Sequence, residues 1–230
     1  MIGVFDSGIG GYNSLRCLRE RFPLLDVAYL ADRKNAPYGT KSEEELLDLI
    51  DRCIDRLLGF GAERVLIACC TASTVWSKLS GRKKEVSMPI ISSVRGALSG
   101  GERRVLVIAT KRTADSGAFS RVIRESFSNI DVREVAAQDL VAKIEFGART
   151  GDLPRATEGE IVKIKKTAAA YNPDSLILGC THFASVEGII AEALPGVKIV
   201  NPARLGAMEM ADQIELSGMN LCERGRVIYM

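Results

Sequence analysis

Val65-Leu66-Ile67-Ala68-Cys69 is a short apolar run that ends in a cysteine, and this stretch decides the fold. Branched apolar residues in a run of this length are typical of a buried β-strand. A second run of the same kind, Leu176-Ile177-Leu178-Gly179-Cys180, places its cysteine 111 residues further along, close to half of the 230-residue chain. We therefore expect two similar units, each with a strand whose carboxyl end presents a thiol.

Other short apolar runs alternate with amphipathic, helix-like stretches along the whole chain. Strands are predicted at residues 2–5, 27–31, 65–68, 105–109, 132–135, 176–178 and 198–200. One intervening helix has clear end signals, because Ser42 and Glu45 form a capping box and Gly59 and Gly61 follow its last turn. The alternation predicts an α/β fold with two similar domains, each a mostly parallel sheet flanked by helices, related by a pseudo-two-fold axis.

The chain is long enough for two domains of about 100 residues each. Ser99-Gly100-Gly101-Glu102 is the best candidate for a seam, and a second crossing is expected near Asn201-Pro202. We predict a first domain of residues 1–94 and 201–230 and a second domain of residues 95–200. Ligands of parallel sheets bind at the carboxyl ends of the strands, so the active site is expected in the cleft between the two domains.

Composition excludes several classes of partner. The chain is 47% hydrophobic and 26% charged, which is ordinary for a globular protein, and its net charge of +2 is too small for a nucleic-acid-binding protein. No apolar run approaches the ~20 residues that span a bilayer, and no export signal precedes the first strand. We therefore expect a cytoplasmic protein that binds neither nucleic acid nor membrane.

Cysteine usage bears on metal binding. In a reducing compartment we expect thiols rather than disulfides. His182 is the only histidine and no C-x-x-C pair occurs, so no metal site is predicted. The cysteines are Cys17, Cys53, Cys69, Cys70, Cys180 and Cys222.

The segment Asp6-Ser7-Gly8-Ile9-Gly10-Gly11 follows the first predicted strand and opens a helix. A dinucleotide-binding fingerprint would require glycine at position 13, where Asn13 stands, so no nucleotide cofactor is predicted. The amides of such a turn suit a small anion such as a carboxylate, with Asp6 and Ser7 facing the same crevice. The alternative is a tight strand-to-helix turn without a ligand.

Cys69 and Cys180 at equivalent strand ends point to proton transfer on two faces of one carbon. A thiol suits this chemistry because its pKa of ~8.5 lies close to ambient pH. Two alternatives remain. Each cysteine could be a buried apolar residue, or Cys180 and His182 could form a Cys-His hydrolase, which lacks an evident orienting group and leaves Cys69 unused.

Residues 35–42, Asn35-Ala36-Pro37-Tyr38-Gly39-Thr40-Lys41-Ser42, lie between the second predicted strand and the capped helix. Their Tyr and Thr hydroxyls predict a flap that donates hydrogen bonds to a polar ligand, and a plain connection is the alternative.

Together these segments resemble the glutamate racemase family, within the wider aspartate/glutamate racemases. The resemblance covers most of the chain and implies a cofactor-independent enzyme with two α/β domains that interconverts L- and D-glutamate for peptidoglycan. It rests on residues 6–11, 37–41, 67–72 and 178–183, with weaker matches at 110–113, Ser116, 145–147 and 201–203.

The resemblance also implies roles for individual residues. Cys69 and Cys180 would each remove the α-proton of one enantiomer, supported by Asp6 and His182 respectively. The partner would be glutamate or a similar acidic amino acid, and a homodimer is common in that family. The residues implied to bind the substrate are Ser7, Pro37, Tyr38, Gly39, Cys70, Thr71, Thr113, Glu145 and Thr181.

The chain departs from the family pattern at Cys70, where the family's Cys-Asn-Thr has an amide. A thiol is a weak donor and acceptor, so one or two hydrogen bonds to the charged substrate would be lost, each worth roughly 1.5–3 kcal/mol. This change motivates two alternatives: racemisation of aspartate or another amino acid, or a relative that binds a ligand with little turnover. The chain also ends at Met230, where family members continue, so a shorter first domain is expected.

Overall fold

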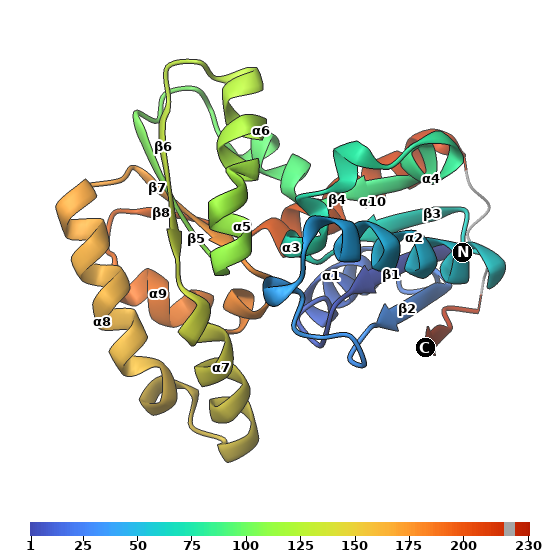
Figure 1. The fold of residues 1–230 in the computed structure, drawn as a ribbon, viewed down its shortest axis with the longest axis horizontal. Helices are drawn as coiled ribbons and strands as arrows, with labels where there is room; N and C mark the ends of the chain where they lie inside the picture. The colour runs from blue at the N-terminus through green and yellow to red at the C-terminus, as the bar shows by residue number, and fades with distance from the viewer. Residues whose placement is uncertain (219–223) are drawn as a thin grey trace. The chain divides into compact units, whose positions relative to one another are not determined.

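The computed structural model describes residues 1–218 and 224–230, which form two compact α/β units (Figure 1). Unit 1 consists of Met1–Ser93 and Ala203–Met230, and unit 2 of Val94–Pro202. Each unit contains one sheet in which every strand pair is parallel. The prediction of an α/β fold with two helix-flanked parallel sheets is confirmed.

The sheet of unit 1 has the strand order β4-β3-β1-β2-β9. β1 (Ile2–Asp6) is central and pairs with β2 (Val27–Ala31) and β3 (Arg64–Ile67). The edge strands β4 (Ser87–Pro89) and β9 (Val227–Tyr229) were not among the predicted strands. The residues of β4, Ser-Met-Pro, include no branched apolar side chain, whereas those of β9, Val-Ile-Tyr, have the composition of a strand and were missed.

β9 is fixed to the rest of unit 1 by a buried carboxylate. Asp26 accepts hydrogen bonds from the backbone N–H of Arg226 at 2.8 Å and from its guanidinium Nη2 at 2.8 Å. A buried carboxylate needs such partners, because desolvation without them is costly. This contact therefore ties the strand to the start of β2.

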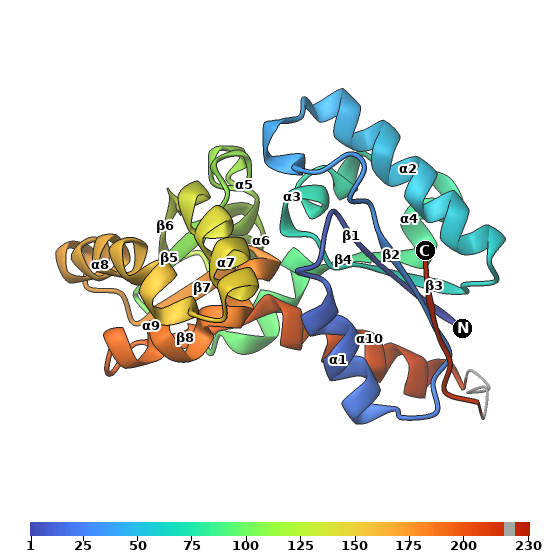
Figure 2. The same cartoon turned by 90° about the horizontal axis from the view of Figure 1, so that it is seen from below.

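Helices cover both faces of this sheet (Figure 2). α2 (Glu43–Gly59) lies on one face, and α1 (Tyr12–Arg21) and α10 (Pro202–Ser217) lie on the other. The hydroxyl of Ser14 in α1 donates to the carbonyl of Ala203 in α10 at 3.0 Å. The remaining short helices are η1 (Tyr38–Thr40), α3 (Cys70–Ser73), η2 (Trp76–Lys78), α4 (Gly81–Val86) and η3 (Ile90–Ala97).

α2 begins and ends where the sequence predicts. The Ser42 hydroxyl accepts from the Glu45 N–H at 3.2 Å, and the Ser42 N–H donates to the Glu45 carboxylate at 2.7 Å, so the capping box is confirmed. The helix stops at Gly59, and Gly61 adopts a φ of +95°, which favours glycine. Its buried residues pack against β1, β2 and β3, and each fully buried Leu or Ile contributes roughly 1.5–3 kcal/mol.

The sheet of unit 2 has the order β6-β5-β7-β8. Its strands are β5 (Arg104–Ala109), β6 (Asp131–Ala136), β7 (Ser175–Gly179) and β8 (Lys198–Val200). The buried core on one side of this sheet joins β5 and β7 to α7, α8, η4 and α9. The helices of unit 2 are α5 (Lys111–Ser116), α6 (Ala118–Ser126), α7 (Gln138–Thr150), α8 (Leu153–Tyr171), η4 (Thr181–Val186) and α9 (Glu187–Ala193).

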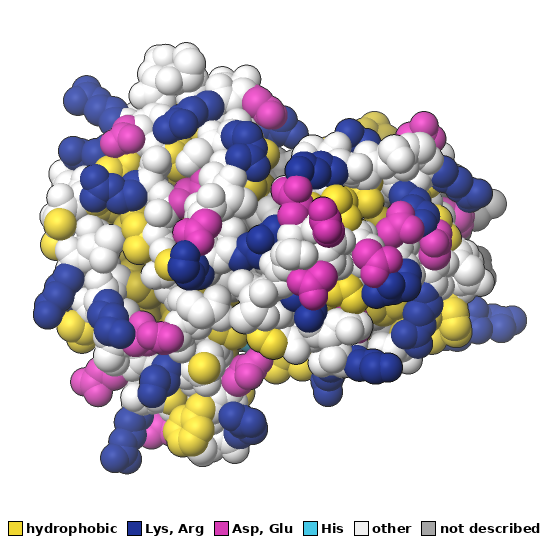
Figure 3. All heavy atoms as spheres, viewed as in Figure 1, with side chains coloured by type: hydrophobic (Ala, Val, Ile, Leu, Met, Phe, Trp, Pro, Cys, Tyr) yellow, Lys and Arg dark blue, Asp and Glu magenta, His cyan; other side chains and the backbone are white. Residues whose placement is uncertain are grey.

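The surface charge, the helices and the cysteines relate to the expectations about nucleic acid, membrane and disulfides. On the face shown in Figure 3, basic and acidic side chains are interspersed. Within residues 1–218 and 224–230, no helix combines the length and apolar content needed to span a bilayer. None of the cysteines of these ranges, Cys17, Cys53, Cys69, Cys70 and Cys180, is part of a disulfide, and Cys222 lies outside the described residues.

Candidate functional site

In unit 1, two adjacent parallel strands bring Asp6, Ser7 and Cys69 to the same edge of the sheet. Phe5 of β1 pairs with Ile67 of β3, so the residues that follow each strand lie side by side. The Ser7 hydroxyl is 3.3 Å from the Cys69 sulfur. The backbone N–H of Ala72 also points at this sulfur, at 3.5 Å, so Cys69 caps the N-terminus of α3.

The glycine-containing turn after β1 is built around the side chain of Asp6. The carboxylate is fully buried and accepts from the Gly8 N–H at 2.8 Å. A Cβ on Gly11 would lie only 2.5 Å from the Asp6 Cβ, so this position requires glycine. The Tyr29 hydroxyl donates to the Gly8 carbonyl at 3.1 Å. At least one amide of the predicted anion-binding turn is thus engaged by the protein's own carboxylate.

The environment of Cys69 favours the protonated thiol. Burial raises the pKa of Cys69 to about 11, and the negative charge of Asp6 acts in the same direction. Hydrogen bonds from Ser7 and from the Ala72 N–H oppose this rise in pKa because they stabilise the thiolate. At neutral pH the Cys69 thiol therefore keeps its proton, and the two groups that stabilise the thiolate, Ser7 and the Ala72 N–H, are in contact with the sulfur.

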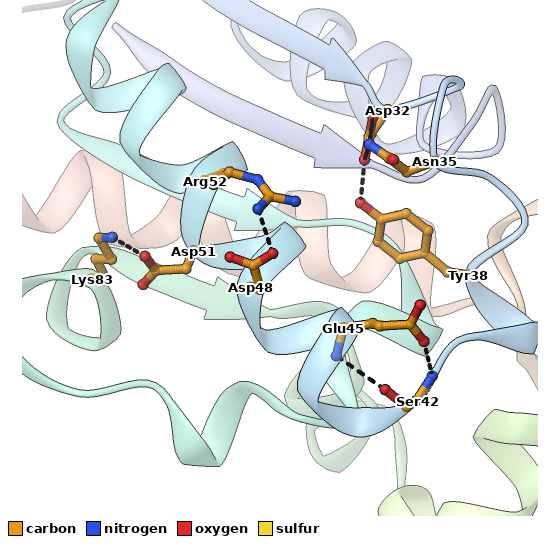
Figure 4. Close-up of polar contacts among 9 residues, drawn as sticks. All are labelled: Asp32, Asn35, Tyr38, Ser42, Glu45, Asp48, Asp51, Arg52 and Lys83. Carbon is orange, nitrogen blue, oxygen red and sulfur yellow. Dashed lines mark hydrogen bonds and ion pairs between the residues drawn. The ribbon is translucent and has the colours of Figure 1, made fainter.

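The flap predicted at residues 35–42 uses its hydroxyls internally. The Tyr38 ring is 2% exposed, packs near Phe5, and donates its hydroxyl proton to Asp32 Oδ2 at 2.7 Å (Figure 4). The Thr40 hydroxyl donates to the Pro37 carbonyl at 3.1 Å. The hydroxyls that were predicted to reach a ligand are therefore engaged within the chain.

Cys70 and Thr71 follow Cys69 as the first residues of α3, and both are buried. Cys70 is 2% exposed. The two residues are placed beside the Cys69 thiol by the same strand-to-helix turn.

In unit 2, Cys180, His182 and Glu145 form a row. Cys180 directly follows β7, and its sulfur lies 3.8 Å from His182 Nδ1. On the other side of the ring, His182 Nε2 is buried and lies 3.4 Å from Glu145 Oε1 of α7, a close contact without hydrogen-bond geometry. Glu145 was predicted as a substrate ligand, and no orienting group was predicted for His182; the structure places Glu145 against the imidazole.

The glycine before Cys180 has a steric reason. A Cβ on Gly179 would lie 2.8 Å from the Ile108 carbonyl oxygen and 2.9 Å from the Ala109 Cβ, both in the adjacent strand β5. Glycine is therefore required for the close approach of β7 and β5 just before the thiol.

Thr113 and Thr181 also lie near the carboxyl edge of this sheet. Thr113 is fully buried in α5, and its hydroxyl is 2.8 Å from that of Thr110, the N-cap residue after β5. Thr181 follows Cys180 and is buried at the start of η4. Thr113 is therefore engaged in the first turn of its own helix.

Each unit thus gathers its own set of predicted residues. Unit 1 brings together Asp6, Ser7 and Cys69, and unit 2 brings together Cys180, His182 and Glu145. No group of three or more potential metal-ligating side chains occurs among the described residues. Asp32 was missed by the sequence analysis, although its position directly after a predicted strand was an available signal. Both sets can hold and release a proton at sulfur.

Comparison with known proteins identifies the family. A family model described as Asp/Glu/Hydantoin racemase matches residues 16–210. The chain is 33% identical to a glutamate racemase of Neisseria gonorrhoeae, over 95% of this chain and 81% of the relative, and 31% identical to one of Aquifex aeolicus, over 96% and 86%. A crystal structure of Francisella tularensis glutamate racemase in complex with D-glutamate superposes with a TM-score of 0.87 and 27% identity, over 99% of this chain and 85% of that one. The chain therefore belongs to the Asp/Glu/Hydantoin racemase family.

Proposed function

We propose that this protein is a cofactor-independent racemase that interconverts L- and D-glutamate, with Cys69 and Cys180 as the two acid/base groups. The observation that carries the proposal is that each unit ends a parallel strand in a thiol that contacts its own polar partner, Ser7 in one and His182 in the other. The relatives named glutamate racemase, and the Francisella tularensis structure with D-glutamate, support glutamate as the substrate.

The reaction balances without an external reagent. The thiolate of one cysteine removes the α-proton and leaves a carbanion, and the thiol of the other donates its proton to the opposite face of that carbon. The product is the mirror image of the substrate, and the two cysteines have exchanged protonation states. One base alone does not supply a proton to the face opposite the one it deprotonates, so the proposal requires the two sulfurs to face the bound α-carbon from opposite sides.

The supporting residues have distinct proposed roles. His182 Nδ1 accepts the proton of Cys180 and generates the thiolate, while Glu145 orients the imidazole through Nε2. Cys69 starts as a thiol, in accord with its raised pKa, and Asp6 adjusts that pKa. The proposed substrate ligands are Ser7, Cys70, Thr71, Thr113, Thr181 and the backbone of Pro37, Tyr38 and Gly39.

Isotope exchange tests the proposal directly. Wild-type protein is incubated with L-glutamate in D₂O, the enantiomers are separated by chiral chromatography, and α-deuterium is measured by NMR or mass spectrometry. We expect D-glutamate labelled at the α-carbon, and a rate at least about a hundredfold lower in Cys69→Ser and in Cys180→Ser.

Cys17→Ser is the matched control, because Cys17 is a half-buried cysteine in α1 that forms no disulfide and lies outside both sets. Its rate should equal that of the wild type. Absence of α-proton exchange in the wild type, or full activity in either strand-end variant, contradicts the proposal.

Cys70 motivates a second substrate. The same assay with L-aspartate distinguishes glutamate from aspartate as the preferred substrate. A higher kcat/KM for aspartate than for glutamate identifies aspartate as the substrate. Binding of glutamate without turnover, unaffected by Cys69→Ser, indicates a ligand-binding relative instead.

We also propose the biological setting that the resemblance implies. The D-glutamate formed supplies peptidoglycan synthesis, and the enzyme acts as a homodimer. Size-exclusion chromatography with light scattering tests the oligomeric state.

A further inference from the structure

Asp32 occupies a position that the proposed reaction does not yet use. It directly follows β2, next to β1, and its backbone N–H donates to the Asp6 carbonyl at 2.9 Å. Asp32 is thus attached to the strand end that carries Asp6 and Ser7.

The Asp32 carboxylate collects donors from the segment that follows it. Asn35 Nδ2 lies 2.9 Å from Oδ1 and 3.0 Å from Oδ2, and the Tyr38 hydroxyl donates to Oδ2 at 2.7 Å. Figure 4 shows Asn35 and Tyr38 converging on this carboxylate. We call residues 32–40 the strap, because the Asp32 carboxylate at its start binds two later residues of the same segment, Asn35 and Tyr38.

Tyr38 links the strap to the reactive thiol. Its ring belongs to the same buried cluster as Phe5 and Cys69, and η1 packs against α3, the helix that Cys69 caps. Burial, with contributions from Cys53 and Asp32, raises the pKa of Tyr38. The phenol therefore keeps its proton and remains a permanent donor to Asp32.

The Tyr38 ring is buried and Gly39 has no side chain, so these two residues of the strap have only backbone groups to offer a ligand, whereas the side chains of Arg33, Lys34, Ala36, Pro37 and Thr40 are exposed. Tyr38 and Gly39 are the first two residues of a 3₁₀ turn, and the first N–H groups of a helical turn have no partner inside it. Such amides are suitable donors to a substrate carboxylate, provided that the segment is held in place.

We propose that Asp32 is a positioning residue: by holding Asn35 and Tyr38 it fixes the strap so that the backbone of Pro37–Gly39 is presented to the substrate. This inference rests on the proposed racemase function. Asp32 itself does not touch the substrate, so its loss weakens binding of ground state and transition state alike and raises KM while leaving kcat nearly unchanged.

The test uses three variants and one matched control. Asp32→Asn keeps the size and shape of the side chain but replaces one acceptor oxygen by an N–H₂ group, which cannot accept from Asn35 or Tyr38. Tyr38→Phe removes only the hydroxyl group, and the double variant carries both changes. Asp48→Asn is the control, because it makes the same chemical change at an exposed carboxylate of α2 whose recorded partner is Arg52 (Figure 4). Steady-state racemisation gives kcat and KM, and hydrogen–deuterium exchange of residues 33–41 reports whether the strap is held.

We expect KM for glutamate to rise about tenfold in both single variants, with kcat changed less than about threefold. The double variant should be no worse than the poorer single one, because the two side chains act as one unit. Amide exchange should accelerate across residues 33–41 in these variants and remain unchanged in Asp48→Asn.

Four outcomes overturn the inference in distinguishable ways. Unchanged KM in Tyr38→Phe, while the wild type racemises glutamate, removes the positioning role and leaves the racemase proposal intact. A fall in kcat at constant KM, or faster exchange throughout unit 1, assigns Asp32 a different role. A wild type without turnover removes the racemase proposal and this inference with it. Tyr38→Phe retains the buried ring, so the inference stays testable even when Asp32→Asn does not fold.

Discussion

The hydroxyl oxygen of Ser7 lies 3.3 Å from the sulfur of Cys69, although 62 positions separate the two residues in the chain. The contact exists because β1 and β3 are neighbours in a parallel sheet and end together. The contact lowers the pKa of Cys69, because a hydrogen bond from Ser7 stabilises the thiolate, whereas burial and the charge of Asp6 raise that pKa.

The first prediction concerns the reactivity of Cys69. Its alkylation by iodoacetamide, followed at the Cys69 peptide by mass spectrometry, should rise with pH around a midpoint of about 11, the pKa of the buried thiol. Ser7→Ala should move the midpoint up and Asp6→Asn should move it down, because the two residues shift the pKa in opposite directions. Equal midpoints in the three proteins would show that neither residue tunes the thiol.

The second prediction concerns stability in alkali. The pKa of Cys69 is about 11 in the folded state against 9.0 for an unperturbed thiol, so between these values the unfolded chain has already released the proton that the folded one keeps. The free energy of unfolding should therefore be unaffected below pH 9 and fall by about 2–3 kcal/mol by pH 11 on account of this group. Urea unfolding at a series of pH values measures it, and Cys69→Ala should show a smaller loss. Cys53 contributes in the same direction, since burial raises its pKa to about 12.

The third prediction separates the roles of His182 and Glu145. His182→Asn should lower kcat at least about a hundredfold, because it removes the acceptor for the Cys180 proton. Glu145→Gln should lower kcat less than about tenfold, since the ring keeps its place and loses only a contact at 3.4 Å. Glu158→Gln, an exposed position of α8, serves as the control. A larger loss in Glu145→Gln than in His182→Asn contradicts these assignments.

The fourth prediction concerns the substrate. Cys70→Asn introduces the amide that the resembled family carries at this position, and each restored hydrogen bond to a charged group is worth roughly 1.5–3 kcal/mol. We expect kcat/KM for glutamate to rise about ten- to a hundredfold. Measuring aspartate in parallel shows whether specificity changes as well, and an unchanged value for glutamate means that this side chain does not reach the substrate.

The fifth prediction compares two glycines. Gly11→Ala should destabilise unit 1 by about 1–3 kcal/mol and reduce activity, because the new Cβ would overlap Asp6. Gly59→Ala should be neutral or slightly stabilising, since a Cβ there meets nothing within 4 Å and the residue ends a helix. Thermal unfolding of both variants checks the difference, and equal Tm values would contradict it.

Sequence patterns predicted the longer strands and the strand-end thiols well, because burial on both faces demands branched apolar runs. β2 and β8 occur at the predicted residues, and β1 differs by one. β4 escaped prediction because Ser87–Pro89 contains no branched apolar residue and is defined by its pairing with β3. β9 has a strand-like composition at Val227–Tyr229 and was missed.

The candidate site was only partly predictable for a similar reason. Cys69 and Cys180 could be found from their own strands, whereas the contact of Glu145 with His182 joins residues far apart in the chain. The sequence around Tyr38 likewise did not predict that its side chain points into the core of unit 1. Its burial depends on packing in a hydrophobic cluster with residues of β1 and α2, which forms only when unit 1 is assembled.

Unit 2 is one continuous piece of chain inserted into unit 1, which needs Ala203–Met230 to complete its sheet and to supply α10. During synthesis, unit 2 therefore has all its residues outside the ribosome before unit 1 does. The half that carries Cys180 is able to finish folding first, and the half that carries Cys69 waits for residues 203–230 before its sheet and α10 are complete.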